Sequence, residues 1–442
     1  HALNTNVTEA RDLASFTLAG LLLVGVGLPG LWWWHSQPRI TVGWQRWTHQ
    51  LGAVLLGLAL AAAVLLLVFQ DLASVMRNHK SLRYMLNPFN TVYAIGRLAY
   101  AEQAQRQLPL QSMGDDAKAR TLSPQEAAPV LVLVVGETAR AANFSIGGYA
   151  RQTTPQLQAL QAQGSLYYFS QVQSCGTNTQ VSVPCMFSHL DRKGYTDSNA
   201  RYESLLDVLQ KAGWAVLWLD NQSGCKGTCE RVPNVTTTEI KNPKWCAGSE
   251  CLDEIMLEGL NERVAALPAE RRAVGTVVVM HQMGSHGPAY YRRSPADKKQ
   301  FTPECTNNAL PACDAQALLN AYDNSIVYTD HFLGRVVQWL QTQQRPAAML
   351  YASDHGESMG EKGIYLHGMP FNIAPKEQTH VPMALWVSPA MRQYWGVDDA
   401  CLLSQRAKPW SHDNWFHTVL GSADVQTALY QPAMDITRAC RR

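Results

Sequence analysis

The chain lacks cysteine before residue 175, lacks a strong charge of either sign, and lacks internal repeats and low-complexity tracts. Its formal net charge is +2 over 442 residues, whereas nucleic-acid-binding proteins carry clustered Lys and Arg. The absence of a repeat argues against a solenoid or propeller. These absences leave a globular chain with no nucleic-acid partner, long enough to form more than one compact unit.

Charged residues are missing altogether from two apolar stretches, Leu13–Trp34 and Leu51–Phe69. With 22 and 19 residues, each is long enough to cross a bilayer core of about 30 Å as a helix. Trp32–Trp34, Trp44 and Trp47 lie where an interfacial aromatic belt is expected. Buried core helices are the alternative, but such helices usually carry a polar face. We therefore predict a membrane hairpin of two transmembrane helices.

This hairpin divides the chain into three predicted regions. Residues 1–70 form a partial transmembrane region, residues 71–128 form juxtamembrane helices and a polar linker, and residues 129–442 form a large C-terminal domain. The chain begins at His1, without an initiator Met or a signal peptide. We therefore expect an N-terminal truncation, with the chain beginning in a loop between membrane spans.

All ten cysteines follow the second apolar stretch, and no two of them have the Cys-x-x-Cys spacing. That missing spacing argues against a zinc knuckle. An even number of cysteines instead favours disulfide bonds and an oxidising compartment, although spacing does not fix which cysteines pair. The cysteines are Cys175, Cys185, Cys225, Cys229, Cys246, Cys251, Cys305, Cys313, Cys401 and Cys440.

From residue 129 onward, short apolar runs alternate with helical patterns. The runs are typical of buried parallel strands, and they occupy Val130–Val135, Ala215–Leu219, Thr276–Met280, Ala348–Ala352 and Val381–Val387. The helical patterns occupy Thr154–Gln163, Tyr202–Ala212, Leu252–Ala266 and Ala315–Gln343. Such alternation predicts one α/β domain whose mostly parallel sheet is sandwiched by helices.

Three of the predicted strands end in residues that can do chemistry. Glu137 follows the first, Asp354 and His355 follow another, and the string from His281 to Gly287 follows a third. Each has a structural alternative, because strand-end acids often cap the next helix. Ligands, however, bind beyond the carboxyl ends of parallel strands. Two carboxylates, an imidazole and a Thr hydroxyl form a four-ligand set that suits Zn²⁺, with Mn²⁺ as the alternative.

The segment Ser174–Ser188 supplies the candidate hydroxyl, since it contains both Thr177 and Thr179. A hydroxyl at a helix N-terminus is well placed to act on a phosphate, because backbone N–H groups there favour the anion. A polar loop closed by a disulfide is the alternative. From the residues alone, Thr177 and Thr179 are equivalent candidates.

Five strings in the sequence resemble the lipid A phosphoethanolamine transferases, which include the mobile colistin-resistance enzymes. They are VVGETARAANFSxxGYAR, SCGTxTxxSVPCMFS, NQSGCKGTC, HQMGSHGPAYY and SDHGESMGEKGIYLHGMP, and the resemblance runs from Asn4 to the strand near Trp386. It implies an alkaline-phosphatase-like periplasmic domain preceded by five transmembrane helices, of which two are visible here.

The resemblance also implies a role for individual residues. Thr179 becomes the nucleophile, and the catalytic zinc is held by Glu137, Thr179, Asp354 and His355. On the substrate side it implies His286 and His367 as contacts of the phosphoethanolamine or of a second zinc, Ser223 and Lys226 as pocket residues, and Asn87 and Thr91 as lipid contacts. Ile95 departs from the family pattern, which has Glu there. The implied disulfides are Cys175–Cys185, Cys246–Cys251 and Cys305–Cys313.

The implied enzyme is a zinc-dependent monomer of the bacterial inner membrane whose catalytic domain lies in the periplasm. It would move phosphoethanolamine from phosphatidylethanolamine to Thr179 and then to a phosphate of lipid A. Capping that phosphate with a cationic group would weaken its attraction for polymyxins such as colistin, and so confer resistance.

Other functions fit parts of the sequence. A sulfatase or phosphodiesterase on the same scaffold would hydrolyse its substrate, but Ser182-Val183-Pro184-Cys185-Met186 lacks the Arg of the sulfatase pattern Cys/Ser-x-Pro-x-Arg. A core sugar or an envelope protein would be an acceptor other than lipid A. A membrane-tethered metal-binding protein without turnover would have little reason to carry these groups at strand ends.

Overall fold

The computed structural model describes residues 20, 23–36, 44–67, 108–248 and 250–441. They belong to two compact units, an N-terminal unit within 14–107 and a C-terminal unit from 108 onward. The N-terminal unit contains the π-helical turn η1 (Leu23–Gly27) and the helices α3 (Leu28–His35) and α4 (Trp44–Leu67). Within the described residues, no helix combines the length and apolar character needed to cross a bilayer. The two membrane spans and the limits of the three regions stay predictions.

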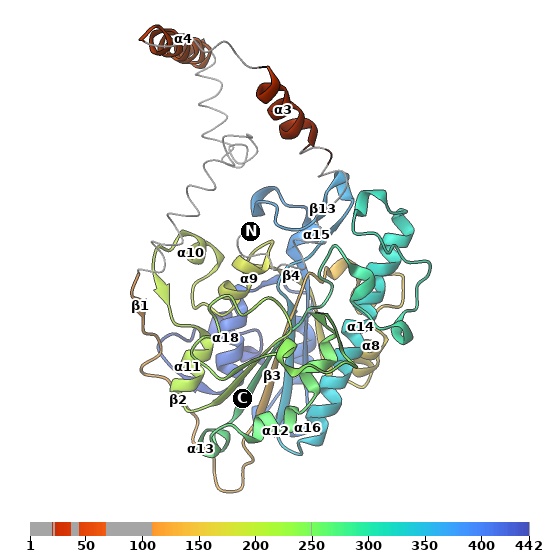
Figure 1. Ribbon diagram of the computed structural model, residues 1–442. Helices are drawn as coiled ribbons and strands as arrows, with labels where there is room; N and C mark the ends of the chain where they lie inside the picture. Colours follow the sequence, from red (N-terminus) through yellow and green to blue (C-terminus); the bar gives the residue numbers. More distant parts are fainter. Residues whose placement is uncertain (1–19, 21–22, 37–43, 68–107, 249, 442) are drawn as a thin grey trace. The chain divides into compact units, whose positions relative to one another are not determined.

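The C-terminal unit is built on an eight-stranded mixed sheet with the order β15-β4-β14-β11-β3-β10-β6-β7 (Figure 1). The strands are β3 (Val130–Gly136), β4 (Leu166–Gln173), β6 (Ala215–Asp220), β7 (Asn234–Thr236), β10 (Thr276–His281), β11 (Ala347–Ser353), β14 (His380–Val387) and β15 (Trp410–Ser411). Neighbouring strands run parallel except at β14, which is antiparallel to both β11 and β4. The α/β class and all five predicted strands are confirmed.

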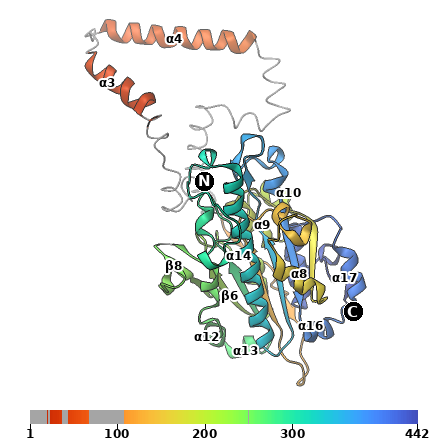
Figure 2. The same cartoon turned by 90° about the vertical axis from the view of Figure 1, so that its right-hand side faces the viewer.

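The central strand β3 explains why the sheet is covered on both faces. Leu131 and Leu133 belong to one apolar cluster, whereas Val132 and Val134 belong to another. Because successive side chains of a strand point to opposite faces, a strand without polar residues must be buried on both sides. Figures 1 and 2, two views at right angles, show helices on either side of the sheet.

The long helix α14 (Ala315–Thr342) lies along one of these faces (Figure 2). Its N-terminus is capped by Asp314, whose carboxylate accepts a hydrogen bond from the N–H of Ala317. Leu318 and Ile326 lie on its apolar side and are buried. α14 therefore confirms the predicted helix Ala315–Gln343 almost to the residue.

Two other predicted helices are confirmed, α8 (Pro155–Ala162) and α11 (Leu205–Lys211). The single helix predicted over Leu252–Ala266 is wrong. A 3₁₀ segment, η5 (Asp253–Leu257), is followed instead by the short helix α12 (Leu260–Ala265). Between them Gly259 has a φ of 62°, a left-handed conformation that interrupts an α-helix and that glycine adopts at little cost.

The strand β4 is an element that the sequence patterns did not reveal. Its first four residues are buried, but Ser170, Gln171 and Gln173 are not, so the apolar run is too short and too aromatic to stand out. Its position matters for the site, because the carboxyl end of β4 leads directly into Ser174–Ser188.

Shorter elements complete the C-terminal unit. They are β1 (Leu110–Gln111), β2 (Lys118–Ala119), α9 (Thr179–Met186), α10 (Arg192–Asp197), β5 (Arg201–Tyr202), β8 (Cys246–Ala247), β9 (Glu250–Cys251), α13 (Ala269–Arg272), β12 (Ser358–Met359), β13 (Tyr365–Leu366), α15 (Lys376–Thr379), α16 (Pro389–Trp395), α17 (Asp399–Gln405), α18 (Asp413–Ser422) and β16 (Val425–Gln426). β1 pairs with β5 and β2 with β16, which fastens the segment before β3 to the rest of this unit.

All ten cysteines are paired. The disulfides join Cys175 to Cys185, Cys225 to Cys229, Cys246 to Cys251, Cys305 to Cys313, and Cys401 to Cys440. The three pairings implied by the family resemblance are confirmed. Five disulfides in one unit are typical of proteins that fold in an oxidising compartment.

The disulfides should differ in how much they stabilise the fold. Cys401 and Cys440 are 39 residues apart, whereas Cys246 and Cys251 are 5 apart. Loop-closure entropy predicts a loss of about 4 kcal/mol for the double serine variant of the first pair and about 2 kcal/mol for that of the second. Denaturant unfolding of the two variants measures both losses. An equal loss would mean that loop entropy does not set the contribution of these bonds.

Candidate active site

The predicted site residues of two strands meet at one edge of the sheet. Glu137 directly follows β3, and Asp354 and His355 directly follow β11. These strands are parallel neighbours, with Gly136 paired to Ser353. Parallel strands present their carboxyl ends at the same edge, so the register alone places the two carboxylates and the imidazole side by side.

The third segment brings Thr179, which is the first residue of α9. The side chain of Asn178 caps this helix by accepting a hydrogen bond from the N–H of Val181 at 3.1 Å. The half-buried Thr179 hydroxyl lies 3.1 Å and 3.2 Å from the two carboxylate oxygens of Glu137, and Oγ1 is 3.4 Å from Nε2 of His355. The hydroxyl is therefore held at a helix N-terminus, against the acid and the imidazole.

Thr177, the other candidate hydroxyl, makes a different contact. Its Oγ1 donates a hydrogen bond of 2.6 Å to the backbone oxygen of Met369. The structure thus separates two residues that are equivalent in the sequence, and it places Thr179 with Glu137.

The donor atoms fit a divalent cation. Glu137, Asp354 and His355 each offer one ligand atom within 4.8 Å of the others. In Asp354, Oδ1 accepts hydrogen bonds from the N–H groups of His355 and Thr138, whereas the buried Oδ2 has no hydrogen-bond partner within the described residues. His355 is oriented by a 2.9 Å hydrogen bond between Nδ1 and the backbone oxygen of Gly356, which directs Nε2 toward the carboxylates. Such outer contacts typically orient a metal-ligating histidine.

Burial and mutual charge shift the pKa values of this cluster. Burial raises the pKa of Asp354 to about 6, and the charge of Glu137 adds to the effect. Burial also opposes ionisation of Glu137, but the hydrogen bond and the charge of His355 hold its pKa well below the usual range. Burial disfavours the imidazolium, yet the two carboxylates raise the pKa of His355 to about 10. The cluster therefore attracts positive charge, and a divalent cation would displace the proton of His355.

Comparisons with known proteins identify the family. The profile described as Sulfatase matches residues 129–425, and the profile described as Phosphoethanolamine transferase EptA/EptB matches residues 1–103. The phosphoethanolamine transferase EptA of Salmonella typhimurium is 42% identical over 412 residues, which are 92% of this chain and 73% of that protein. The chain belongs to the phosphoethanolamine transferase family.

Two further members support this assignment. The phosphatidylethanolamine transferase Mcr-1 of Escherichia coli is 39% identical over 402 residues, which are 87% of this chain and 72% of that protein. The solved structure of the integral membrane protein lipooligosaccharide phosphoethanolamine transferase A (EptA) from Neisseria meningitidis matches with a TM-score of 0.91 and 37% identity, covering 100% of this chain and 81% of that chain. The family resemblance of the sequence is thus confirmed.

In this transferase, His286 and His367 lie beside the cluster. The ring centroids of His367 and His355 are 4.4 Å apart, and those of His286 and His367 are 5.7 Å apart. Nδ1 of His367 lies 3.2 Å from the buried carboxylate of Glu357. Burial lowers the pKa of His286 to about 3, so its ring is neutral near pH 7. The structure therefore brings both predicted histidines to the site.

Ser223 and Lys226 lie together on the loop after β6. Nζ of Lys226 donates hydrogen bonds to the hydroxyl of Ser223 at 2.7 Å and to its backbone oxygen at 2.9 Å. Among the described residues, neither side chain is hydrogen-bonded to Glu137 or Thr179. Their substrate role stays a prediction. Asn87 and Thr91 lie outside the described residues.

Asp220 and His281 also lie beside the cluster. Asp220 was not predicted, and His281 was predicted only as part of the string that follows the third strand. Nδ1 of His281 lies 3.2 Å from Asp220, and Nε2 lies 3.9 Å from Glu137. The same Asp220 carboxylate accepts hydrogen bonds from the N–H groups of Gln222 and Gly224, so it connects the Ser223 loop to the site. Their positions at strand ends could have predicted this contact, because His281 and Asp220 end neighbouring strands and are paired in register.

Gly284 should not tolerate a residue that has a Cβ atom. Its φ is 51°, and an added Cβ would lie 2.7 Å from the backbone oxygen of Glu137. We expect Gly284→Ala to displace Glu137 and to reduce both zinc affinity and transfer by about 10- to 100-fold. Gly148→Ala is the matched control, because Gly148 also has a positive φ but its Cβ would meet no atom within 4 Å. Both variants should lose about 1–3 kcal/mol of stability from backbone strain. Equal zinc affinities in the two would refute the contact.

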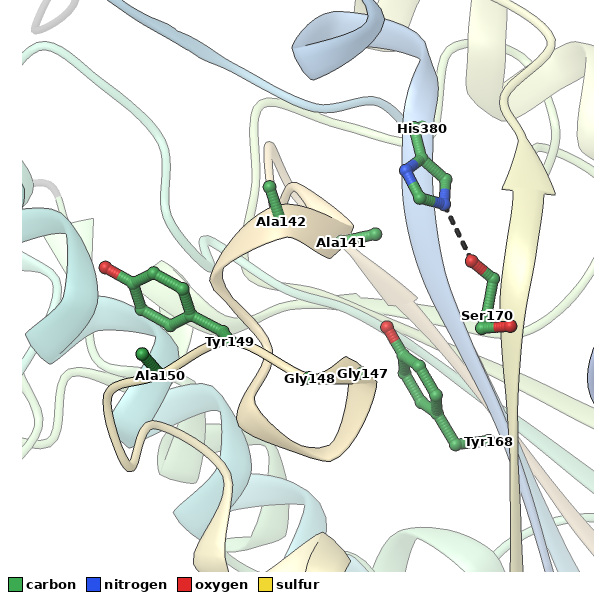
Figure 3. A pocket seen from close by; sticks show the side chains of 9 residues that line it. All are labelled: Ala141, Ala142, Gly147, Gly148, Tyr149, Ala150, Tyr168, Ser170 and His380. Carbon is green, nitrogen blue, oxygen red and sulfur yellow. Dashed lines mark hydrogen bonds between the residues drawn. The ribbon is translucent and has the colours of Figure 1, made fainter.

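A separate cavity of about 290 Å³ lies beside the turns after Glu137 (Figure 3). Tyr168, Ser170 and His380 line it, and His380 shares a hydrogen bond with the backbone oxygen of Ser170. None of the predicted site residues lines this cavity.

Proposed function

We propose that the chain transfers phosphoethanolamine from phosphatidylethanolamine to a phosphate of lipid A, with Thr179 as the covalent acceptor and zinc as cofactor. The observation that carries the proposal is the position of the Thr179 hydroxyl, which lies 3.1 Å from Glu137 at the first residue of a helix. Named relatives that transfer phosphoethanolamine or phosphatidylethanolamine support the group that is moved.

Four side chains would hold the zinc ion, Glu137, Thr179, Asp354 and His355. A bound divalent cation lowers the pKa of a coordinated hydroxyl and polarises a phosphoryl oxygen. Asn178 and Glu137 orient the Thr179 hydroxyl. The Asn178 side chain caps the start of α9, and the Glu137 carboxylate accepts a hydrogen bond from the hydroxyl. The helix N-terminus favours the negative charge of the phosphoryl group.

The proposed reaction has two displacements. Oγ1 of Thr179 forms a bond to phosphorus as the bond to diacylglycerol breaks, and the hydroxyl proton leaves with diacylglycerol. An oxygen of the protonated lipid A phosphate then forms a bond to the same phosphorus as the bond to Oγ1 of Thr179 breaks, and the proton of that phosphate passes to Oγ1. His286 and His367 lie where they can stabilise the transferred charge or pass these protons.

The site would work at a membrane surface. We infer that residues 1–70 anchor the chain in the bacterial inner membrane and that the disulfide-rich unit lies in the periplasm. Leu51, Leu55 and Leu60 on α4 are more than half exposed, as expected of side chains that face lipid. The capped lipid A would attract polymyxins less strongly, which gives colistin resistance.

The test is incubation of the full chain with phosphatidylethanolamine labelled in the head group. The proposal predicts released diacylglycerol and label on Thr179, followed by label on lipid A when lipid A is added. Free phosphoethanolamine as the main product would identify a hydrolase instead. Mass spectrometry of lipid A from cells with and without the gene tests the acceptor, and label on a core sugar or a protein would overturn it.

Removal of the metal should stop the first step. After chelation, we expect labelling of Thr179 to fall by at least about 10³-fold and to return with one equivalent of zinc, since the metal supplies several kcal/mol of charge stabilisation. Metal analysis of the purified protein gives the stoichiometry. Full labelling by metal-free protein would exclude the zinc mechanism.

A further inference from the structure

His412 lies buried at the start of α18, and its ring contacts the segment that leads to Thr179 and the last residue of β11, which precedes Asp354. Its Nδ1 accepts a 3.1 Å hydrogen bond from the backbone N–H of Cys175, and its Nε2 donates a 3.0 Å hydrogen bond to the backbone oxygen of Ser353. Cys175 is four residues before Thr179, and Ser353 directly precedes Asp354. One imidazole thus joins the two segments whose separation determines the geometry of the site.

The backbone of His412 adds a third connection. Its N–H donates a 2.9 Å hydrogen bond to the backbone oxygen of Gln173, the last residue of β4. The ring is therefore anchored at the point where β4 ends. From there it reaches both the segment after β4 and the end of β11.

Ser182 makes a parallel connection from within α9. Its hydroxyl donates a hydrogen bond to the backbone oxygen of Asp354 and accepts one of 3.3 Å from the N–H of Gly176. Ser182 Oγ also lies 3.4 Å from Nδ1 of His412. Ser182 and His412 are both almost fully buried, so these contacts are shielded from bulk solvent.

These partners require one tautomer of the ring. A backbone N–H needs an acceptor and a backbone oxygen needs a donor, and a neutral imidazole supplies one of each. Burial lowers the pKa of His412 to about 3, which keeps the ring neutral near pH 7. Neither an imidazolium nor an apolar side chain could make both bonds.

We propose that His412 is a positioning residue that sets the distance between the Thr179 hydroxyl and the carboxylates of the metal site. It touches neither substrate nor metal, and it acts through the backbone of Cys175 and Ser353. The inference rests on the proposed function, because the distance matters through attack by Thr179. A misplacement of about 1 Å in a reacting group can lower a rate by about 100-fold.

The same helix offers a matched control, His417. It is also buried and also accepts a hydrogen bond from a backbone N–H, that of Gln431 at 3.2 Å. Gln431 lies in the C-terminal segment, away from both Thr179 and Asp354 in the chain. Loss of His417 should therefore destabilise the fold without moving the site.

The experiment compares the full chain with His412→Leu, His412→Gln and His417→Leu. His412→Leu keeps the bulk of the side chain but removes both hydrogen bonds, whereas the amide of His412→Gln retains one acceptor and one donor. Three quantities are measured, namely kcat and KM for labelling of Thr179, deuterium uptake by the peptide 174–188, and the visible spectrum of the cobalt-substituted protein.

We expect His412→Leu to lower kcat by about 100-fold with KM changed less than about threefold, to raise deuterium uptake in 174–188, and to alter the cobalt spectrum. His412→Gln should recover most of kcat, and His417→Leu should leave all three quantities near those of the parent chain. Equal kcat in His412→Leu and the parent, no recovery in His412→Gln, or an equal loss in His417→Leu would each overturn the proposal. Absence of label in the parent chain would instead overturn the proposed function. In that case deuterium uptake and the cobalt spectrum would still test whether His412 positions Thr179 against the metal site.

Discussion

Replacing Thr179 with alanine is expected to abolish labelling of the protein by phosphatidylethanolamine and to lower turnover by at least about 10⁴-fold, or about 5.5 kcal/mol of transition-state stabilisation. The reason is that Thr179 supplies the bond-forming oxygen in the proposed reaction, and its hydroxyl contacts both Glu137 and His355. Mass spectrometry of the intact protein after exposure to labelled lipid measures the first step directly.

Thr177→Ala is the matched control for this prediction. Thr177 has the same side chain two residues away, but its hydroxyl donates to the backbone oxygen of Met369. Its loss should remove one hydrogen bond, worth about 1 kcal/mol, and reduce turnover by less than about tenfold. The opposite outcome, with Thr177→Ala inactive and Thr179→Ala active, would move the nucleophile to Thr177.

Asp354→Asn is expected to have the second largest effect, a loss of about 10³-fold or more in turnover together with loss of bound zinc. The amide has nearly the shape of the carboxylate but carries no charge, and its Nδ2 cannot ligate a metal as a carboxylate oxygen does. Oδ2 of Asp354 is buried without a hydrogen-bond partner within the described residues and lies 3.4 Å from Nε2 of His355, so the change acts on an oxygen that faces another proposed ligand. Zinc stoichiometry and the rate of Thr179 labelling should fall together.

Asp330→Asn controls for the removal of a buried acid. The Asp330 carboxylate caps α8 by accepting 2.9 Å hydrogen bonds from the N–H groups of Gln156 and Leu157. Its replacement should lower the free energy of unfolding by about 1 kcal/mol and leave zinc binding unchanged. If Asp354→Asn kept its zinc while Asp330→Asn lost it, the assignment of the metal ligands would be wrong.

Local sequence patterns were sufficient to predict the buried strands of the sheet and the site residues at their ends. Apolar runs fill most of β3, β6, β10, β11 and β14, and such short runs are typical of strands buried on both faces. The ends of β3 and β11 then placed Glu137 and Asp354 at one edge of the sheet. β4 escaped prediction because Ser170 and Gln171 interrupt its apolar pattern, and its membership is decided by pairing with β14.

The remaining parts of the site depend on contacts between residues far apart in the chain. Thr177 and Thr179 differ only in what their hydroxyls reach, Met369 in one case and Glu137 in the other. His412 is more than two hundred residues from Cys175, so no local pattern could connect them. His281 belongs to a string predicted to follow a strand, but its contacts with Glu137 and Asp220 follow from the register of β10 between β3 and β6.

The most direct test of the account is a crystal structure of the zinc-loaded chain with anomalous diffraction data collected at the zinc edge. We predict one strong anomalous peak within about 2.0–2.2 Å of ligand atoms of Glu137, Thr179, Asp354 and His355. A zinc ion bound elsewhere, with the Thr179 hydroxyl turned away from those three side chains, would contradict it.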